Sequence, residues 1–163
     1  MRGILALQMK GFCKYQFVVY SSLHKNTFMA TIQKFEDLKV WQKARLLCKE
    51  IFSLTSIANF SKDFGLKDQI NRSSGSIMDN IVEGFGRKGN LEFINFLTYS
   101  SGSTCECKSQ LYRAFDRNYI TEEKRKELSD LADEITKMIT ALIIYLGGSE
   151  LSGTKFKGRA KKS

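Results

Sequence analysis

Six residues, Gly84 to Gly89, read GFGRKG and match the G-x-G-x-x-G spacing of a loop that binds dinucleotide phosphates. In that chemistry the glycines let the backbone approach the pyrophosphate, and the N-terminus of the following helix receives its charge. Such a loop works only where a strand enters it and a helix leaves it, inside a parallel sheet. A helical pattern precedes Gly84, so we interpret the segment as a corner between helices. Gly84 and Gly86 are then expected to end a helix with positive φ, and no cofactor is expected.

Few other residues offer groups for catalysis or metal binding. The single histidine, His24, lies in the first 28 residues, so the remaining chain lacks the commonest general base and zinc ligand. Asp79 and Glu83 are spaced i, i+4 on one helix face and could share a metal ion, but we favour structural roles for them. Cys105 and Cys107 point to roughly opposite sides of a helix. The sequence predicts no catalytic residue, no metal ion, no small-molecule substrate and no enzymatic activity.

The positive charge of the chain is concentrated at its two ends. The formal net charge is +9, of which residues 1–28 contribute +4 and residues 155–163 contribute +5. The residues between these ends carry 17 basic and 17 acidic side chains. A basic tail adds salt-dependent affinity for phosphate backbones without reading sequence; the alternative is a solvated tail that aids solubility. The basic residues of this tail are Lys155, Lys157, Arg159, Lys161 and Lys162.

Three further basic residues, Arg72, Arg87 and Lys88, are candidates for contacting nucleic acid. Arg72 falls within a predicted helix, and Arg87 and Lys88 fall at its C-terminal corner. If several subunits assemble with these corners aligned, the three residues form a multivalent basic rim. Two structural alternatives remain open. Arg72 is spaced to pair with Asp68 at i−4, and Arg87 and Lys88 are placed to interact with the helix C-terminal dipole.

Helical periodicity covers almost the whole chain from residue 35 onward. Asp37 is a candidate N-cap of the first helix, and Phe35 a candidate hydrophobic staple. We expect helices over about 37–58, 62–85, 90–117 and 122–146. Their apolar positions recur on one face at Val40, Ala44, Leu47, Ile51, Leu54 and Ala58; at Leu66, Ile70, Ser74, Ile77 and Ile81; at Phe93, Leu97, Ser100, Thr104, Cys107, Leu111 and Ala114; and at Leu128, Leu131, Ile135, Met138, Leu142 and Tyr145.

Small residues occupy the middle of the second and third predicted helices. They form two runs, Ser73–Ser76 and Ser100–Thr104, and we interpret these runs as a crossing where the two backbones approach closely. Gly75 costs roughly 1 kcal/mol in a helix interior, so we expect a neighbouring helix to pack against it. Thr121 is a candidate N-cap of the fourth helix, and Gly147 and Gly148 are expected to end it.

Four amphipathic helices with short connections predict an all-α fold, an antiparallel up-down-up-down four-helix bundle. We assign the bundle to residues 31–148 and a flexible basic tail to residues 149–163. Residues 1–30 are interpreted as an extension that is disordered or not native, because Met29 is a plausible start. Neither a targeting signal nor a membrane-spanning segment is recognised, and cysteines in helical patterns favour reduced thiols in the cytoplasm. Leu46, Phe85 and Tyr99 could belong either to the core or to a subunit interface.

Three segments in the same order carry a family resemblance. They are KFEDLKVWQKA (34–44), FGLKDQINRSSGSIMDNIVEGFGRKGNLEFINFL (64–97) and SSGSTCECKSQL (100–111). The chain resembles the four-helix-bundle proteins of the 23S rRNA intervening-sequence family over roughly residues 33–146. Family members usually carry a proline before the second helix and another after the Ser-Ile pair, whereas this chain contains no proline.

The resemblance implies a bundle that assembles into a ring-like homo-oligomer, a pentamer, with no known enzymatic activity. Related bundles are nucleic-acid-binding accessory proteins of diversity-generating retroelements. On this basis the leading hypothesis is a non-enzymatic oligomeric scaffold that contacts RNA or a ribonucleoprotein through basic rims and tails. The alternative is a protein–protein adaptor without direct nucleic-acid binding. A cofactor-using enzyme is disfavoured, and the absence of a thermal shift with dinucleotides would dismiss it.

Overall fold

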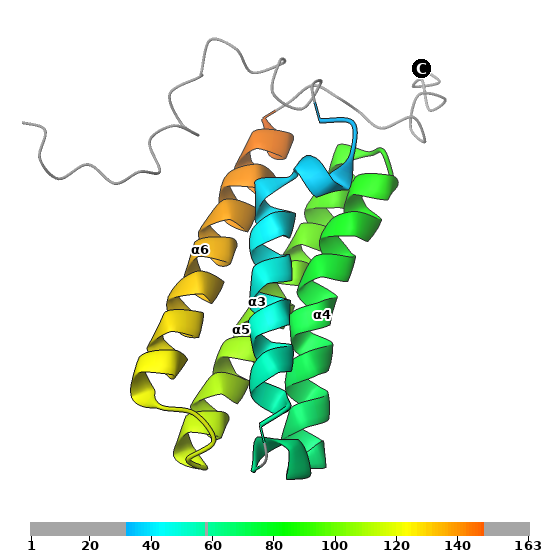
Figure 1. Cartoon of the computed structure of the whole chain (residues 1–163). Helices are drawn as coiled ribbons and strands as arrows, with labels where there is room; N and C mark the ends of the chain where they lie inside the picture. Colours follow the sequence, from blue (N-terminus) through cyan, green and yellow to red (C-terminus); the bar gives the residue numbers. More distant parts are fainter. Residues whose placement is uncertain (1–31, 58, 149–163) are drawn as a thin grey trace, which may run out of the picture.

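The computed structural model describes residues 32–57 and 59–148, which fold into α-helices without strands. The four long helices are α3 (Lys39–Thr55), α4 (Phe64–Gly86), α5 (Asn90–Asp116) and α6 (Glu122–Gly147), preceded or joined by the 3₁₀ turns Phe35–Asp37 and Phe60–Lys62. They lie side by side as a bundle (Figure 1). The predicted all-α class is confirmed. The segments 1–30 and 149–163, expected to be an extension and a tail, lie outside the described residues.

The helix boundaries follow local capping at two of the predicted positions. The Thr121 side chain accepts a hydrogen bond from the Lys124 backbone N–H at 3.3 Å, and α6 ends at Gly147, as expected. Asp37 does not cap α3, because it belongs to a 3₁₀ turn and the N-cap is Leu38, without a side-chain hydrogen bond. The N-cap of α4 is Asp63, whose carboxylate accepts from the Leu66 N–H at 3.1 Å.

The buried residues coincide with the predicted apolar faces of α3, α4 and α5. The face predicted for α6 is wrong in part, because Leu131, Met138, Leu142 and Tyr145 are only partly buried and Ala132, Ile139 and Leu146 are buried instead. Leu47, Ile77, Leu111 and Ile135, one from each helix, are completely buried in a single core. Burial of these faces removes apolar area from water, which is the main stabilisation of such a bundle. Phe85 packs against this core, whereas Leu46 and Tyr99 are exposed. Ala58 lies outside the described residues.

The α4–α5 pair is joined by hydroxyl groups at mid-length. Ser100 Oγ donates to the Ile77 carbonyl oxygen at 2.9 Å, and Ser76 Oγ lies 3.0 Å from Ser103 Oγ. Small residues let the two backbones come close enough for these bonds, which satisfy polar groups at the centre of the bundle. The predicted crossing of Ser73–Ser76 with Ser100–Thr104 is therefore confirmed.

Two glycine predictions are wrong, whereas α4 ends at Gly86 as expected. Gly75 was expected to face a neighbouring helix, but a Cβ at this position would meet no atom within 4 Å. Gly84 was expected to end the helix with positive φ, yet it is buried inside α4, which continues to Gly86. The positive φ falls on Lys88, at 56°. Gly84 is instead needed for close packing, because its Cβ would lie 2.7 Å from Cδ2 of Phe93.

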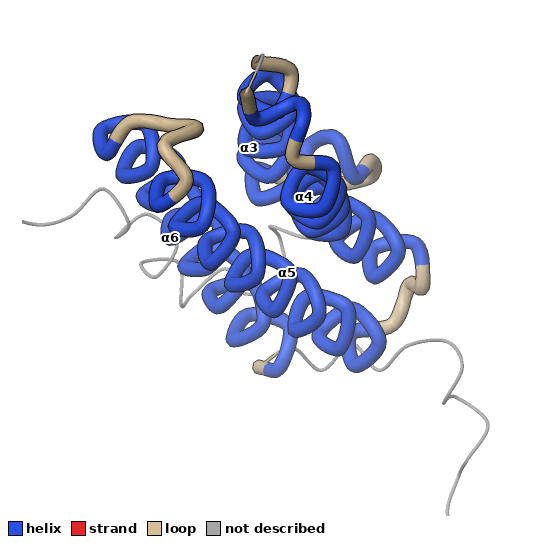
Figure 2. Tube along the Cα trace, turned by 90° about the horizontal axis from the view of Figure 1, so that it is seen from below, coloured by secondary structure: helices blue, strands red, loops and turns tan. Residues whose placement is uncertain are grey.

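Seen from below, α5 and α6 lie along one side of the bundle and α3 and α4 along the other (Figure 2). The connection from α4 to α5 spans residues 87–89, and the connection from α5 to α6 spans residues 117–121. No helix in the described part of the chain is both long and apolar enough to cross a membrane.

Candidate nucleic-acid interface

Arg72 lies on α4 and pairs with the carboxylate one turn before it. Its guanidinium is 2.5 Å from the Asp68 carboxylate, and this hydrogen bond raises the pKa of Arg72. The ion pair is the structural alternative that the i, i+4 spacing indicates. The Arg72 side chain is nevertheless 78% exposed. Because exposed ion pairs stabilise a protein by about 1 kcal/mol or less, a phosphate can compete with Asp68 for this guanidinium.

Arg87 and Lys88 lie at the corner between α4 and α5. Arg87 forms the C-cap of α4, pairs with Glu83 and lies over the Phe96 ring, with its guanidinium carbon 5.4 Å from the ring centre. The hydrogen bond to Glu83 raises the pKa of Arg87. Lys88 is exposed, so its ammonium group projects from the end of the bundle. Both residues are accessible, but the charge of Arg87 is already balanced by Glu83.

The structure does not gather the predicted basic residues into one patch. Arg72 and Arg87 lie on the same side of α4, but fifteen residues at 1.5 Å each separate them by about 22 Å. The described residues carry 17 basic and 16 acidic side chains, and eight ion pairs join charges among them. The remaining candidates lie outside the described residues: Lys155, Lys157, Arg159, Lys161 and Lys162. The folded body is therefore close to neutral.

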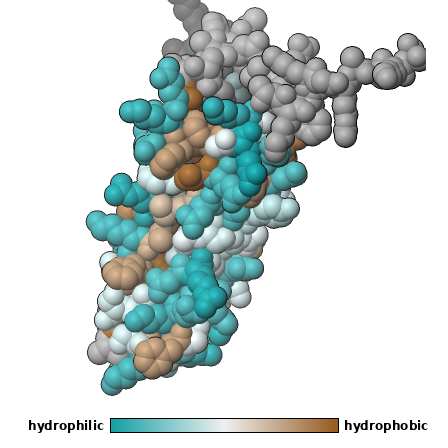
Figure 3. Space-filling model, turned by 90° about the vertical axis from the view of Figure 1, so that its right-hand side faces the viewer, coloured by the Kyte–Doolittle hydropathy of each residue, from teal (hydrophilic) through white to brown (hydrophobic). Residues whose placement is uncertain are grey.

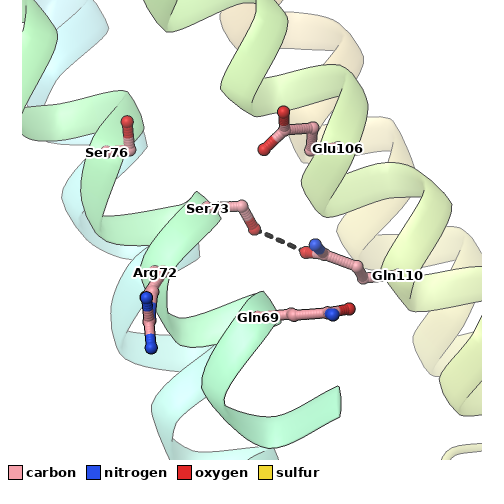
Figure 4. Close-up of a pocket in the computed structure, with 6 residues that line it drawn as sticks. All are labelled: Gln69, Arg72, Ser73, Ser76, Glu106 and Gln110. Carbon is pink, nitrogen blue, oxygen red and sulfur yellow. Dashed lines mark hydrogen bonds between the residues drawn. The ribbon is translucent and has the colours of Figure 1, made fainter. Parts of the chain in front are cut away.

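A polar pocket of about 280 Å³ lies between α4 and α5, which we call the α4–α5 pocket. Figure 4 shows Ser73 and Gln110 pointing toward each other across the gap, with Glu106 beside them and Arg72 at the edge. All of its lining side chains are polar: Gln69, Arg72, Ser73, Ser76, Glu106 and Gln110. The serines leave the space that longer side chains would fill.

Several lining groups of the pocket are already held in place. Ser73 Oγ is 2.6 Å from Gln110 Oε1 and donates to it, and Gln69 Oε1 accepts from Arg113 at 2.7 Å. Among the described residues, Glu106 has neither a hydrogen-bond partner nor an ion-pair partner. The pocket thus offers a fixed amide and a free carboxylate side by side, two groups that hydrogen-bond to ligands but do not make an acid–base pair.

The sequence interpretation did not identify Glu106, Gln110 and Gln69 as site residues. Glu106 and Gln110 are spaced i, i+4 on α5, next to its buried face, and this spacing is the one signal that places them together. It does not show that they face Ser73 of α4, because that contact depends on how the two helices are aligned. Arg72 is the one residue of the pocket that the sequence singled out.

The thiols and acids of the described part of the chain form no metal centre. No group of three or more metal-binding side chains among these residues lies close enough to hold an ion. Cys107 is buried, and burial raises the pKa of its thiol to about 12 despite a hydrogen bond with Ser73. Cys105 is exposed on the other side of α5, as the two-residue spacing predicts.

Comparison with known proteins supplies the remaining observation. No curated protein is significantly similar to the chain. A solved structure from Bacteroides thetaiotaomicron, a protein with unknown function from the S23 ribosomal protein family, is 27% identical with a TM-score of 0.60. The match covers 64% of this chain and 95% of that one. Residues 36–141 match the family model of the 23S rRNA-intervening sequence protein. With this match over most of its bundle, the chain belongs to the 23S rRNA-intervening sequence protein family.

Proposed function

We propose that the protein is a non-enzymatic four-helix bundle that assembles into a ring-like homo-oligomer, a pentamer, and contacts RNA or a ribonucleoprotein. The observation that carries this proposal is the separation of charge. The described bundle is close to neutral and extensively ion-paired, whereas residues 155–163 carry five basic side chains and no acidic one. Assembly would bring several such tails together, which multiplies a weak contact into an avid one.

The proposal includes an antiparallel up-down-up-down order of the helices. Contacts between neighbouring helices support this order, because residue numbers rise along one helix as they fall along the other. Asn71 contacts Thr55 and Ser74 contacts Cys48 between α3 and α4. Between α3 and α6, Lys124 pairs with Glu50 and Lys43 pairs with Glu134. In such a bundle the α4–α5 corner lies at the end where α6 finishes, and Asn90 Nδ2 donates to the Leu146 carbonyl oxygen there at 3.3 Å.

Self-association is supported by a row of uncharged exposed residues along α5, which ends one turn before the exposed Asp116. We call it the α5 stripe, and its residues recur at alternating intervals of four and three: Leu91, Asn95, Thr98, Gly102, Cys105, Ser109 and Tyr112. All seven are exposed. An average interval of 3.5 residues is that of a helix seam that packs against another helix. On one face of the bundle, apolar side chains (brown) lie at several separate places among hydrophilic ones (Figure 3).

RNA contact through the tail is tested by comparing the full chain with a chain that ends at residue 154. Binding to a structured RNA would be measured over a salt series, and light scattering would check that both chains have the same oligomer mass. Loss of five cations should reduce the magnitude of the slope of log K against log salt by roughly 3.5 to 4.5 per chain. The Arg87→Ala, Lys88→Ala double variant measures the contribution of the corner. Identical affinity and slope for the full and shortened chains would contradict the proposed tail contact.

A protein–protein adaptor remains the second candidate, since the α5 stripe could pack against another protein. On that hypothesis the bundle shows no salt-dependent RNA affinity beyond that of the tail. We further propose a cytoplasmic location, which the three free thiols of the described residues support. We also propose that the protein is not a cofactor-using enzyme. A rise of its melting temperature on addition of a dinucleotide would contradict this.

A further inference from the structure

The α4–α5 pocket holds hydrogen-bonding groups that the fold does not use. The Glu106 carboxylate can accept at both oxygens, and no described residue donates to it. Gln110 accepts from Ser73 through Oε1, which fixes the amide and leaves its Nε2 group without a partner among the described residues. An acceptor pair and a donor therefore lie on neighbouring turns of α5, one helical turn apart.

This combination is complementary to one nucleobase edge. Guanine presents N1–H and N2–H₂ as adjacent donors and O6 as an acceptor beside them, so a carboxylate can take both donors while an amide N–H binds O6. We propose that the α4–α5 pocket binds the Watson–Crick edge of a guanine base in single-stranded RNA. The inference rests on the proposed RNA contact, and it assigns recognition of a guanine base to the α4–α5 pocket.

The other bases do not satisfy the same groups. Adenine places the N1 acceptor where guanine has a donor, so its lone pair would face the Glu106 carboxylate. Cytosine has one donor group next to an acceptor, and uracil has one donor between two acceptors. Each therefore leaves an oxygen of the carboxylate unpaired or opposed by a lone pair, which costs affinity in a site built for hydrogen bonding.

The surroundings of the pocket suit a flipped-out base. The pocket beside the Ser73–Gln110 hydrogen bond has a volume of about 280 Å³, and single-stranded RNA is usually recognised through unstacked bases. Arg72, at the pocket edge, can exchange its exposed pair with Asp68 for a phosphate of the same nucleotide. Tyr99 is 60% exposed and lies two turns before Glu106 on the same side of α5, where a neighbouring base can stack.

The test uses the full chain and ten-nucleotide oligouridines that carry one central guanosine, inosine or adenosine. Fluorescence anisotropy should show a preference for guanosine over adenosine of about tenfold, the size expected for a bidentate base contact. Inosine lacks the 2-amino group, so it should lose most of the preference. Glu106→Gln should abolish the preference, whereas Asp130→Asn, which removes an exposed charge on α6, should retain it.

The direction of the Glu106→Gln effect separates base recognition from general electrostatics. Removing a negative charge strengthens non-specific RNA binding, so a selective loss of guanosine affinity has the opposite sign. RNA binding without a guanosine preference would overturn the pocket assignment and leave the RNA contact standing. A change of oligomer mass in Glu106→Gln would show that the pocket lies between copies, which also overturns it.

A separate measurement tests the pocket without the RNA backbone. Guanosine 5′-monophosphate should shift the side-chain amide signals of Gln69 and Gln110 in NMR spectra of the full chain, and adenosine 5′-monophosphate should not. If the chain binds no RNA at all, the proposed function fails. If these amide signals also stay unchanged with guanosine 5′-monophosphate, the inference about the pocket fails independently.

Discussion

Cys105 and Cys107 show how two identical side chains acquire different chemistry from burial. Cys105 is exposed on the α5 stripe, and Cys107 is completely buried in the core. Removal from water disfavours a thiolate, so the pKa of Cys107 rises from 9.0 to about 12. Cys107 therefore keeps its proton in the folded protein at pH 8, and an alkylating reagent at this pH should modify Cys107 only after unfolding.

The same difference in pKa predicts a loss of stability in base. The folded-state pKa lies above the unfolded value, so the unfolded chain releases the proton first as the pH rises. The contribution of Cys107 to stability is therefore intact below pH 9.0 and declines toward pH 12, by at most about 1.4 kcal/mol per pH unit. Urea unfolding of the wild-type protein and of Cys107→Ala between pH 8 and pH 10.5 should show a shallower decline for the variant. Parallel curves would contradict this assignment.

The packing of α4 against α5 depends on Gly84, because a glycine has no side chain. An alanine Cβ at position 84 would lie 2.7 Å from Phe93 Cδ2 and 2.8 Å from Phe96 Cβ. Both atoms belong to side chains held near their own backbone, so they cannot move aside without shifting α5. Overpacking of this kind costs about 1–3 kcal/mol, which exceeds the gain of up to about 1 kcal/mol from replacing glycine in a helix.

Gly75, on the same helix, is the matched control. Its Cβ would meet no atom within 4 Å, so Gly75→Ala should keep the helix-propensity gain and raise the free energy of unfolding by up to about 1 kcal/mol. Gly84→Ala should lower it. Chemical denaturation of the two variants measures both effects at once. Equal stabilisation by the two substitutions would show that α5 can shift to make room for a Cβ at position 84 of α4.

We expect assembly of the molecule to depend on the α5 stripe, and a charge introduced at the centre of the stripe tests this. Gly102→Glu places a carboxylate at the centre of the α5 stripe, one turn before the exposed Glu106, and a Cβ at this position meets no atom within 4 Å. The variant should remain helical by circular dichroism but lose oligomer mass, because an unpaired charge buried in an interface is costly.

Light scattering should give the wild-type protein a mass of five times 18.6 kDa if it is a pentamer. Gly102→Glu should shift this mass toward one chain, whereas Thr140→Glu, which adds the same charge to an exposed position on α6, should not. An unchanged mass for Gly102→Glu would exclude the α5 stripe as the contact between copies.

Helix existence, helix type and the core faces of α3, α4 and α5 could be predicted because they depend on periodicity along one segment, whereas the buried face of α6 differs from the predicted one. Ile77 of α4 and Leu111 of α5 each belong to a row of apolar residues on one face of their helix. The hydrophobic effect favours burial of that face in the core. Thr121 and Gly148 act through their own neighbours in the chain, so the ends of α6 were predicted as well. Asp37 was misassigned because a 3₁₀ turn, which periodicity does not indicate, precedes α3.

The α4–α5 pocket and the role of Gly84 depend instead on the alignment of two helices. Ser73 and Gln110 are 37 residues apart, and they meet because the hydroxyl bonds at the crossing set how far α5 is shifted along α4. The period of apolar residues specifies which side of a helix is buried. It does not specify how far the helix is rotated about its axis or shifted along a neighbouring helix. Packing resolves that freedom, and with it which polar side chains share a pocket and which glycine must remain a glycine.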